Sequence, residues 1–264
     1  MDRKPLQGTT ERPRFSVSLF VSCLADLFRP SVAFNSIVLL EQAGCCVAVP
    51  TQQTCCAQPA YNCGDYEAAI PVAKQLIETF ESADYVVVPS GSCAGMISHH
   101  YPKLLKGQWR QRAIDLSAKT YELSTFLREV ANFDISGIDG SSLRKIAYHD
   151  SCAGLRELGI AQAPRKLLED LCGTPPTDLA QGQQCCGFGG TFCAKMPALA
   201  DKMVDDKIDA FLASGSEILA GGDLGCLMHI AGRAKRRGQA IEVRHIAELL
   251  TLDVSGAAIG EGKP

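Results

Sequence analysis

The sequence predicts an α/β protein of two tandem, pseudo-symmetric domains, each with a small, mostly parallel sheet flanked by helices. Strand-like and helix-like segments alternate along the 264 residues, as they do in parallel α/β folds. One cysteine pattern also occurs twice, with gaps of 31, 6 and 29 residues in the first copy and 32, 6 and 32 in the second. Core cysteines have no reason to recur in register, so we interpret the chain as a duplicated protein whose thiolates bind metal. The two copies are Cys23, Cys55, Cys56, Cys63 and Cys93, and then Cys152, Cys185, Cys186, Cys193 and Cys226.

The first half is predicted to contain three strands, at residues 17–21, 47–49 and 85–88, and two longer helices. A helix over residues 31–42 would end at Gly44, since glycine is common just after a helix. A second helix is indicated by apolar residues at spacings of three and four, and Pro71 fits it only in the first turn. These apolar residues are Ile70, Ala73, Ile77 and Phe80. Cys93 is expected in the loop after the third strand.

The second half repeats this order, with strands at residues 146–148 and 218–220 and a helix at 162–171. Another helix is predicted from Pro197 to Gly215, and Cys226 is expected in the loop after the last strand. The buried side of the helix from Pro197 to Gly215 would carry Leu199, Met203, Ile208, Phe211 and Leu212.

Glycines and serines near residues 133–142 indicate the connection between the halves. The domains are therefore predicted to span residues 14–136 and 142–252, and the tail from residue 255 is expected to be frayed.

Composition excludes several classes of protein. A net charge of −3 predicts no nucleic-acid partner, and no apolar run is long enough to span a membrane. An odd number of cysteines with two Cys-Cys pairs fits a reducing cytoplasm better than a disulfide framework. Residues 15–23 resemble a short lipoprotein signal, but residues 145–152 have the same strand-then-cysteine form in mid-chain. We therefore interpret Cys23 as a ligand at the end of a strand.

Four cysteines in each half are the candidate ligands. In parallel α/β folds the loops after the strands meet in one crevice, so cysteines tens of residues apart can gather there. Four thiolates can hold either an iron–sulfur cluster or zinc. Adjacent cysteines favour the cluster, because neighbouring thiolates can reach different irons, and glycine N–H groups after the second pair could bond its sulfurs. The two sets are Cys23, Cys55, Cys56 and Cys93, and Cys152, Cys185, Cys186 and Cys226.

The spacing of these sets resembles the paired cysteine-rich CCG domains of heterodisulfide reductase and of the glycolate oxidase iron–sulfur protein. The strings at residues 55–60, 91–96, 149–152, 185–192 and 226–230 resemble the lactate-utilization protein A family more closely. That resemblance implies a cytoplasmic electron-transfer subunit of a complex that oxidises L-lactate to pyruvate. It also implies a 4Fe-4S cluster in each domain and two partner subunits, at least one with iron–sulfur clusters.

The chain departs from the heterodisulfide reductase pattern at the fifth thiolate of each half. Met96 stands at that position in the first half, and the region of Met228 and His229 in the second. Cys63 and Cys193 could supply the missing ligands or be small neighbours, and His229 could replace a thiolate or face other helix residues. The first pair also reads Cys-Cys-Ala rather than Cys-Cys-Gly.

Three further features leave alternatives open. His149 and Asp150 could orient Cys152 or relay protons, or they could cap the turn after the strand. His99 and His100 are expected on a helix. Cys45, Cys46 and Cys172 have no counterpart in the repeat and are interpreted as core or strand residues.

Two other functions compete with electron transfer. One is a thiol–disulfide oxidoreductase, and the other is a zinc-stabilised scaffold without redox activity. No flavin or nicotinamide motif occurs in the sequence, so the chain is not expected to oxidise lactate alone.

Overall fold

The computed structural model describes residues 15–143, 145–180 and 182–261. They form two four-stranded sheets in which every neighbouring pair of strands is parallel, ordered β2-β1-β3-β4 and β6-β5-β7-β8. The predicted fold class, two α/β units with parallel sheets, is therefore confirmed. The strands are β1 (Phe15–Leu19), β2 (Cys45–Ala48), β3 (Tyr85–Val88), β4 (Thr120–Glu122), β5 (Ile146–His149), β6 (Thr177–Asp178), β7 (Ile218–Gly221) and β8 (Glu242–His245).

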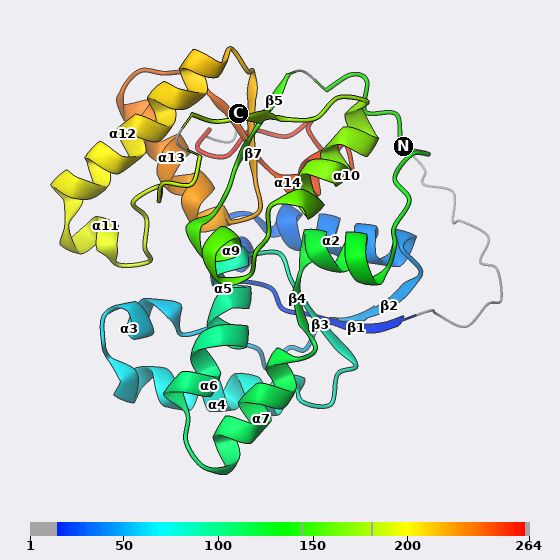
Figure 1. Ribbon diagram of the computed structural model, residues 1–264, viewed down its shortest axis with the longest axis vertical. Coiled ribbons are helices and arrows are strands. Elements are labelled where there is room, and N and C mark those ends of the chain that lie inside the picture. The colour runs from blue at the N-terminus through cyan, green and yellow to red at the C-terminus, as the bar shows by residue number, and fades with distance from the viewer. Residues whose placement is uncertain (1–14, 144, 181, 262–264) are drawn as a thin grey trace.

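Helices connect the strands and flank both sheets (Figure 1). Those of the first half are α1 (Cys23–Phe28), α2 (Pro30–Gln42), α3 (Gln58–Asn62), α4 (Tyr66–Phe80), α5 (Gly91–Gly95), α6 (Tyr101–Leu104), α7 (Gln108–Ser117) and α8 (Leu123–Thr125). Two π-helical turns, Met96–His100 and Phe126–Val130, extend α5 and α8. Those of the second half are α9 (Cys152–Glu157), α10 (Gln162–Cys172), α11 (Phe192–Lys195), α12 (Pro197–Ser214), α13 (Leu224–Arg236) and α14 (Ile246–Leu250).

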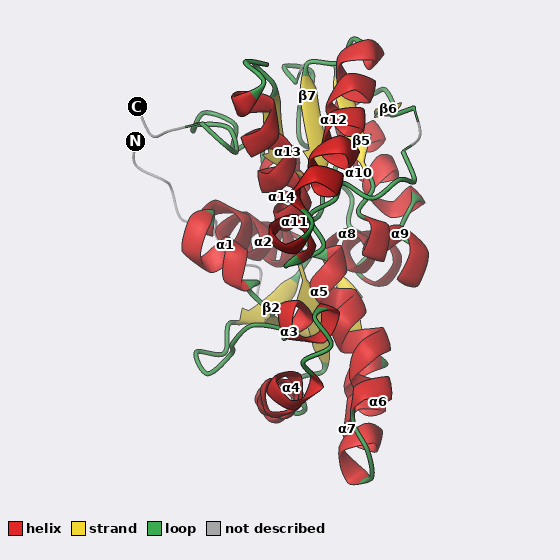
Figure 2. Ribbon diagram, turned by 90° about the vertical axis from the view of Figure 1, so that its left-hand side faces the viewer, coloured by secondary structure: helices red, strands yellow, loops and turns green. Residues whose placement is uncertain are grey.

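The two sheets face each other through the helices that follow their strands. Helix α5 of the first half packs on α9 of the second, and α1 packs on α13. Farther out, α2 contacts α14 and α8 contacts α10. The α5–α9 and α1–α13 contacts are equivalent when the two halves are exchanged, and so are the α2–α14 and α8–α10 contacts. This is the relation expected of a pseudo-twofold axis. Figure 1 shows α5 and α9 side by side between the lower and upper sheets, and Figure 2 shows α2 and α14 in the same layer of helices.

Close packing of α5 on α9 depends on glycine. A Cβ added to Gly91 would lie 2.7 Å from Ser151 Oγ and 3.1 Å from Gly154 Cα. Only a residue without a side chain allows the two helix starts to approach this closely.

Several sequence predictions of local structure are wrong. Cys93 and Cys226 lie in helices, α5 and α13, not in loops. Helix α4 begins at Tyr66, so Pro71 lies beyond its first turn and leaves one intrahelical hydrogen bond unmade. On α12 the side chains of Leu199 and Leu212 are exposed, whereas Ile208 and Phe211 are buried as predicted.

The tail is also more ordered than expected. Ala258 and Ile259 are buried, and the Ile259 N–H bonds the carbonyl of Val243 in β8. The predicted domain limits, residues 14–136 and 142–252, stay a prediction, and residue 14 lies outside the described residues. Among the described residues, no helix combines the length and apolar character that a membrane span requires.

Candidate metal centres

Four short helix starts position one cysteine each. Cys23 and Cys152 are the first residues of α1 and α9, directly after the N-cap residues Ser22 and Ser151. Each serine Oγ accepts a hydrogen bond from a backbone N–H of its helix, as in common N-caps. A thiolate at a helix start is stabilised by the helix dipole and the free N–H groups. Within the sets, however, hydrogen bonds to Cys55 and Cys185 raise the pKa of Cys23 and Cys152, so these two thiols keep their protons.

Cys93 and Cys226 occupy the third positions of α5 and α13, one turn into the helix. Ser90 caps α5, and its Oγ accepts the N–H of Cys93 itself at 3.3 Å. Asp223 precedes α13, and one of its carboxylate oxygens accepts the Ser92 N–H of the other half at 2.8 Å. Asp223 thus connects the helix of Cys226 to the helix of Cys93.

The first predicted set comes together in space. The Sγ atoms of Cys23 and Cys55 are 3.9 Å apart, and those of Cys56 and Cys93 are 3.3 Å apart. Cys56 and Cys93 are buried, and the other two are half-buried. Tyr101 donates its hydroxyl to the Cys56 carbonyl at 3.0 Å, which holds the cysteine loop in place.

The second set has the same arrangement. The Sγ atoms of Cys152 and Cys185 are 3.7 Å apart, and the Gly187 N–H points to the Cys185 Sγ at 3.4 Å. Cys186 and Cys226 are both buried. The Sγ atoms of these two cysteines and one ring nitrogen of His149 lie within 4.8 Å of one another.

One cysteine of each set is strongly acidified by its neighbours. Hydrogen bonds from the thiols of Cys23 and Cys56 lower the pKa of Cys55. Hydrogen bonds from Cys152 and Cys186 lower the pKa of Cys185 in the same way. The thiols that donate these bonds have raised pKa values. Each set therefore holds negative charge already, which suits the binding of a cation.

The residue after each Cys-Cys pair takes a left-handed backbone conformation. Gly187 has φ +84°, and an added Cβ there would meet the Ala200 carbonyl oxygen at 2.8 Å. Ala57, at the equivalent position, has φ +66° despite its side chain. The Cys-Cys-Ala sequence therefore keeps the backbone shape of Cys-Cys-Gly, although the left-handed conformation costs Ala57 about 1–2 kcal/mol.

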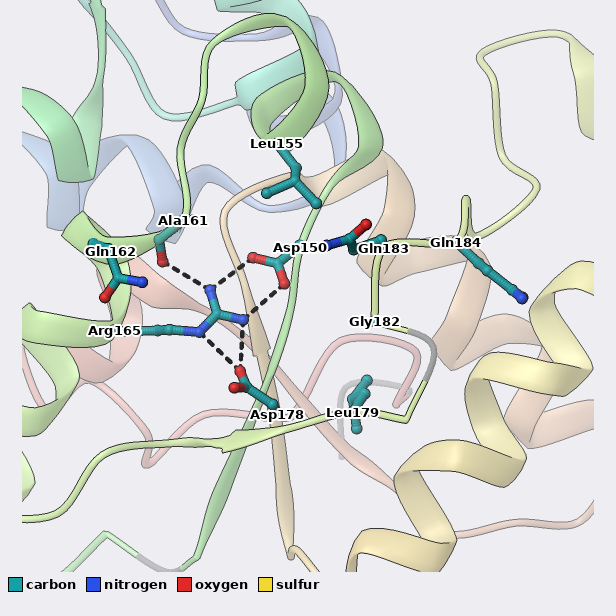
Figure 3. Close-up of a pocket in the computed structure, with 10 residues that line it drawn as sticks. All are labelled: Asp150, Leu155, Ala161, Gln162, Arg165, Asp178, Leu179, Gly182, Gln183 and Gln184. Atoms are coloured by element: carbon teal, nitrogen blue, oxygen red, sulfur yellow. Dashed lines mark hydrogen bonds and ion pairs between the residues drawn. The ribbon is translucent and has the colours of Figure 1, made fainter.

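Two cavities adjoin the second set. One of about 200 Å³ reaches the thiols and is lined by both halves, including Asn62 and His100 from the first half. The other, of about 600 Å³, lies beside β5. There the Arg165 guanidinium forms two hydrogen bonds with Asp150, at 2.7 and 2.8 Å, and a further one with Asp178 (Figure 3). The charge of Arg165 is thereby balanced, and Arg165 holds the Asp150 carboxylate in place.

Comparison with known proteins places the chain in a family. The model of the cysteine-rich CCG domain matches twice, at residues 17–98 and 146–231. Lactate utilization protein A of Halalkalibacterium halodurans is 48% identical over 236 residues, covering 89% of this chain and 96% of that protein. Its counterpart from Shouchella clausii is 47% identical, covering 89% and 98%. The one from Exiguobacterium is 47% identical, covering 92% and 99%. The chain belongs to the lactate utilization protein A family.

Both sets fit a metal ion or an iron–sulfur cofactor. Each supplies four thiols, two from helix starts and two from the Cys-Cys loop, and soft thiolates are the ligands of zinc and of iron–sulfur clusters. The glycine N–H at Cys185 is a sulfur-directed donor of the kind found around such centres.

The three additional candidates make contacts of their own. The Cys63 Sγ is 2.8 Å from Thr191 Oγ1 of the other half. Cys193 lies in α11 near the Gly190 carbonyl. His229 packs against Phe188, with ring centroids 6.2 Å apart. Among the described residues, the histidine that groups with the thiols is His149.

The structure also shows where the remaining histidines and cysteines of the sequence analysis lie. Ser151, not His149 or Asp150, caps the turn before Cys152. His99 and His100 lie on a helix as expected, and His100 Nε2 is 3.1 Å from Glu157 of the other half. Cys45 and Cys46 lie on β2, the first buried and the second exposed, and Cys172 ends α10.

Sequence reasoning missed three buried charged residues near the sites. Asp223 is 3% exposed, Glu122 5% and Lys207 3%. Lys207 bonds the Gly182 carbonyl at 2.7 Å, and burial lowers its pKa. The sequence signal for Asp223 was its place three residues before Cys226, equivalent to Ser90 before Cys93. Glu122 and Lys207 offered none.

Proposed function

We propose that this chain is the iron–sulfur electron-transfer subunit of a cytoplasmic complex that oxidises L-lactate to pyruvate. Each half would hold one 4Fe-4S-type cluster, through Cys23, Cys55, Cys56 and Cys93 in the first and Cys152, Cys185, Cys186 and Cys226 in the second. The observation that carries the proposal is the duplicated set of four thiols, two from helix starts and two from the Cys-Cys loop, that come together in each half.

The arrangement of the halves supports electron transfer between two centres. Helix α5 with Cys93 packs directly on α9 with Cys152, and Asp223 bonds across the same interface. A bound cluster would accept and release single electrons. The protein around it supplies thiolate ligands, N–H donors and a buried environment, and these tune its potential.

The family supports the substrate. The relatives are named for lactate utilization. All thirteen cysteines of this chain, each within the described residues, are free thiols, which fits the reducing cytoplasm. We infer that two further subunits complete the complex, at least one with its own iron–sulfur clusters, and that lactate is oxidised in a partner.

Growth on lactate tests this function in the cell. A deletion strain of the organism that encodes the chain should grow on glucose but fail on L-lactate, and the intact gene should restore growth. Cys56→Ser and Cys186→Ser variants should not restore it, whereas Cys46→Ser should, because Cys46 is exposed on β2. Normal growth of the deletion strain on lactate would contradict the proposed role.

Metal analysis separates electron transfer from the alternatives. A zinc-stabilised scaffold would be colourless, and chelation of its zinc would unfold it. A thiol–disulfide oxidoreductase would reduce a disulfide substrate with reduced viologen as electron donor. The proposal expects a brown protein with no turnover of that substrate.

A further inference from the structure

The second cysteine set contains a histidine for which the first set has no equivalent. His149 is the last residue of β5 and is 2% exposed. Its donor atom and the Sγ atoms of Cys186 and Cys226 lie within 4.8 Å of one another. The structure thus places three buried donors of nitrogen and sulfur around one point.

Both ring nitrogens of His149 are buried without a hydrogen-bond partner among the described residues. A buried polar atom left without a partner destabilises the fold, so native proteins rarely keep one without a reason. His245, equally buried, accepts the Ala247 N–H on Nδ1 at 3.2 Å. A metal ion next to His149 would provide the partner that its ring lacks.

The first half shows that this position does not require nitrogen for packing. Phe20, at the same place in the repeat, is fully buried in the core cluster that contains Cys56 and Cys93. An apolar ring thus fits beside an equivalent pair of thiols. Packing alone therefore does not account for a histidine at position 149.

We propose that His149 is a nitrogen ligand of the metal centre in the second half. The two centres then differ in their donors, with thiolates alone in the first and thiolates plus one imidazole in the second. The inference rests on the proposed function in taking that centre to be an iron–sulfur cluster. The four cysteines stay ligands, so the imidazole adds a neutral donor, and the potentials of the two centres should differ.

Pulsed electron paramagnetic resonance on anaerobically purified full-length protein tests the ligand. Protein labelled with ¹⁵N only in histidine is compared with unlabelled protein. We expect a nitrogen coupling that changes with the isotope in the wild type and in His229→Phe but is lost in His149→Phe. An isotope-independent spectrum of the wild type, or a coupling that survives in His149→Phe, would overturn the inference.

His149→Phe is the matched variant because it copies Phe20 of the first half, and the wild-type comparison decides the question even if the variant fails to fold. Protein without iron would refute the proposed function but not this ligand. In that case Co²⁺ alone is titrated into the reduced protein. We expect His149→Phe to weaken one of two binding steps at least about tenfold and His229→Phe to weaken neither. Equal affinities for the wild type and His149→Phe would overturn the inference.

Discussion

The two halves place four cysteines at equivalent points of the same fold but surround them with different residues. The three residues before Ser22 and Cys23 are Leu19, Phe20 and Val21, whereas those before Ser151 and Cys152 are Tyr148, His149 and Asp150. The first environment is apolar. The second is rich in groups that bond, ionise or coordinate.

This difference separates the residues that position a metal from the residues that surround it. The cysteines and their helix starts determine where a metal can bind, and they are duplicated. The strand residues just before them determine the charge and the ligands around it, and they are not duplicated. In the second half, Lys207 and Asp150 are buried charged residues, and Asp150 bonds the half-buried Arg165. One fold can therefore present two unequal centres.

The largest effect is expected from removing one buried thiol of each set. Cys56→Ser and Cys186→Ser should each abolish the cluster of their own half and leave the other, because the sets share no cysteine. Iron and acid-labile sulfide per chain should fall to about half in each variant. Loss of all iron from either single variant would show that the two halves form one centre.

A smaller effect is expected where the halves touch. On the α2–α14 side, Glu248 is 1% exposed and accepts Arg29 Nε and Ser31 Oγ, both at 2.7 Å. On the α8–α10 side, Arg128 and Asp170 form an exposed pair at 2.8 Å. Glu248→Ala should cost about 3–5 kcal/mol in unfolding free energy, because it removes the buried carboxylate that pairs with the half-buried Arg29.

Asp170→Ala is the matched control and should cost only about 0–1 kcal/mol, as exposed pairs do. Urea unfolding of the purified protein measures both. Equal losses in the two variants would mean that burial does not distinguish the two contacts.

The turns after the Cys-Cys pairs should respond in opposite directions. Gly187→Ala places a Cβ against the Ala200 carbonyl at a left-handed position and should cost about 1–3 kcal/mol. Ala57→Gly relieves the same backbone conformation and should stabilise by up to about 1 kcal/mol. Thermal unfolding of both variants checks the signs. Destabilisation by Ala57→Gly would contradict the equivalence of the turns.

A last effect concerns pH. Burial raises the pKa of Glu122 to about 7, from an ordinary value of 4.5. Between these values the native state keeps a proton that the unfolded chain releases, so stability falls as pH rises, by at most about 1.4 kcal/mol per pH unit. Glu122→Gln should flatten that decline relative to the wild type. Urea unfolding between about pH 5.5 and about pH 8 measures it, and parallel curves would refute it.

The sequence predicted the fold and the grouping of the cysteines because both depend on short-range patterns. The strands β3, β5 and β7 carry β-branched or buried apolar runs, and the repeat of Cys23 at Cys152 needs no knowledge of the fold. The short strands β4, β6 and β8 were not predicted, since each is at most four residues long and contains a charged residue, and Glu122 and Arg244 become buried only in the fold.

Contacts between the halves were beyond sequence reasoning. Asp223 meets Ser92 across 131 positions, and Glu248 meets Arg29 across 219. Nothing local marks either pair. His149 was singled out beside Cys152, but its partners in space are Cys186 and Cys226, which only the order of the strands brings to it. Helical spacing also predicted too wide a buried face on α12, because Leu199 and Leu212 have the expected spacing but are exposed.

The central claim is that each half holds an iron–sulfur cluster on its own four cysteines. The most direct test is to purify the wild-type chain without oxygen and measure iron, acid-labile sulfide and zinc per chain. We predict a brown protein with about eight irons and about eight sulfides, four of each per half, and little zinc. A colourless protein with about two zinc ions and no sulfide would contradict the claim.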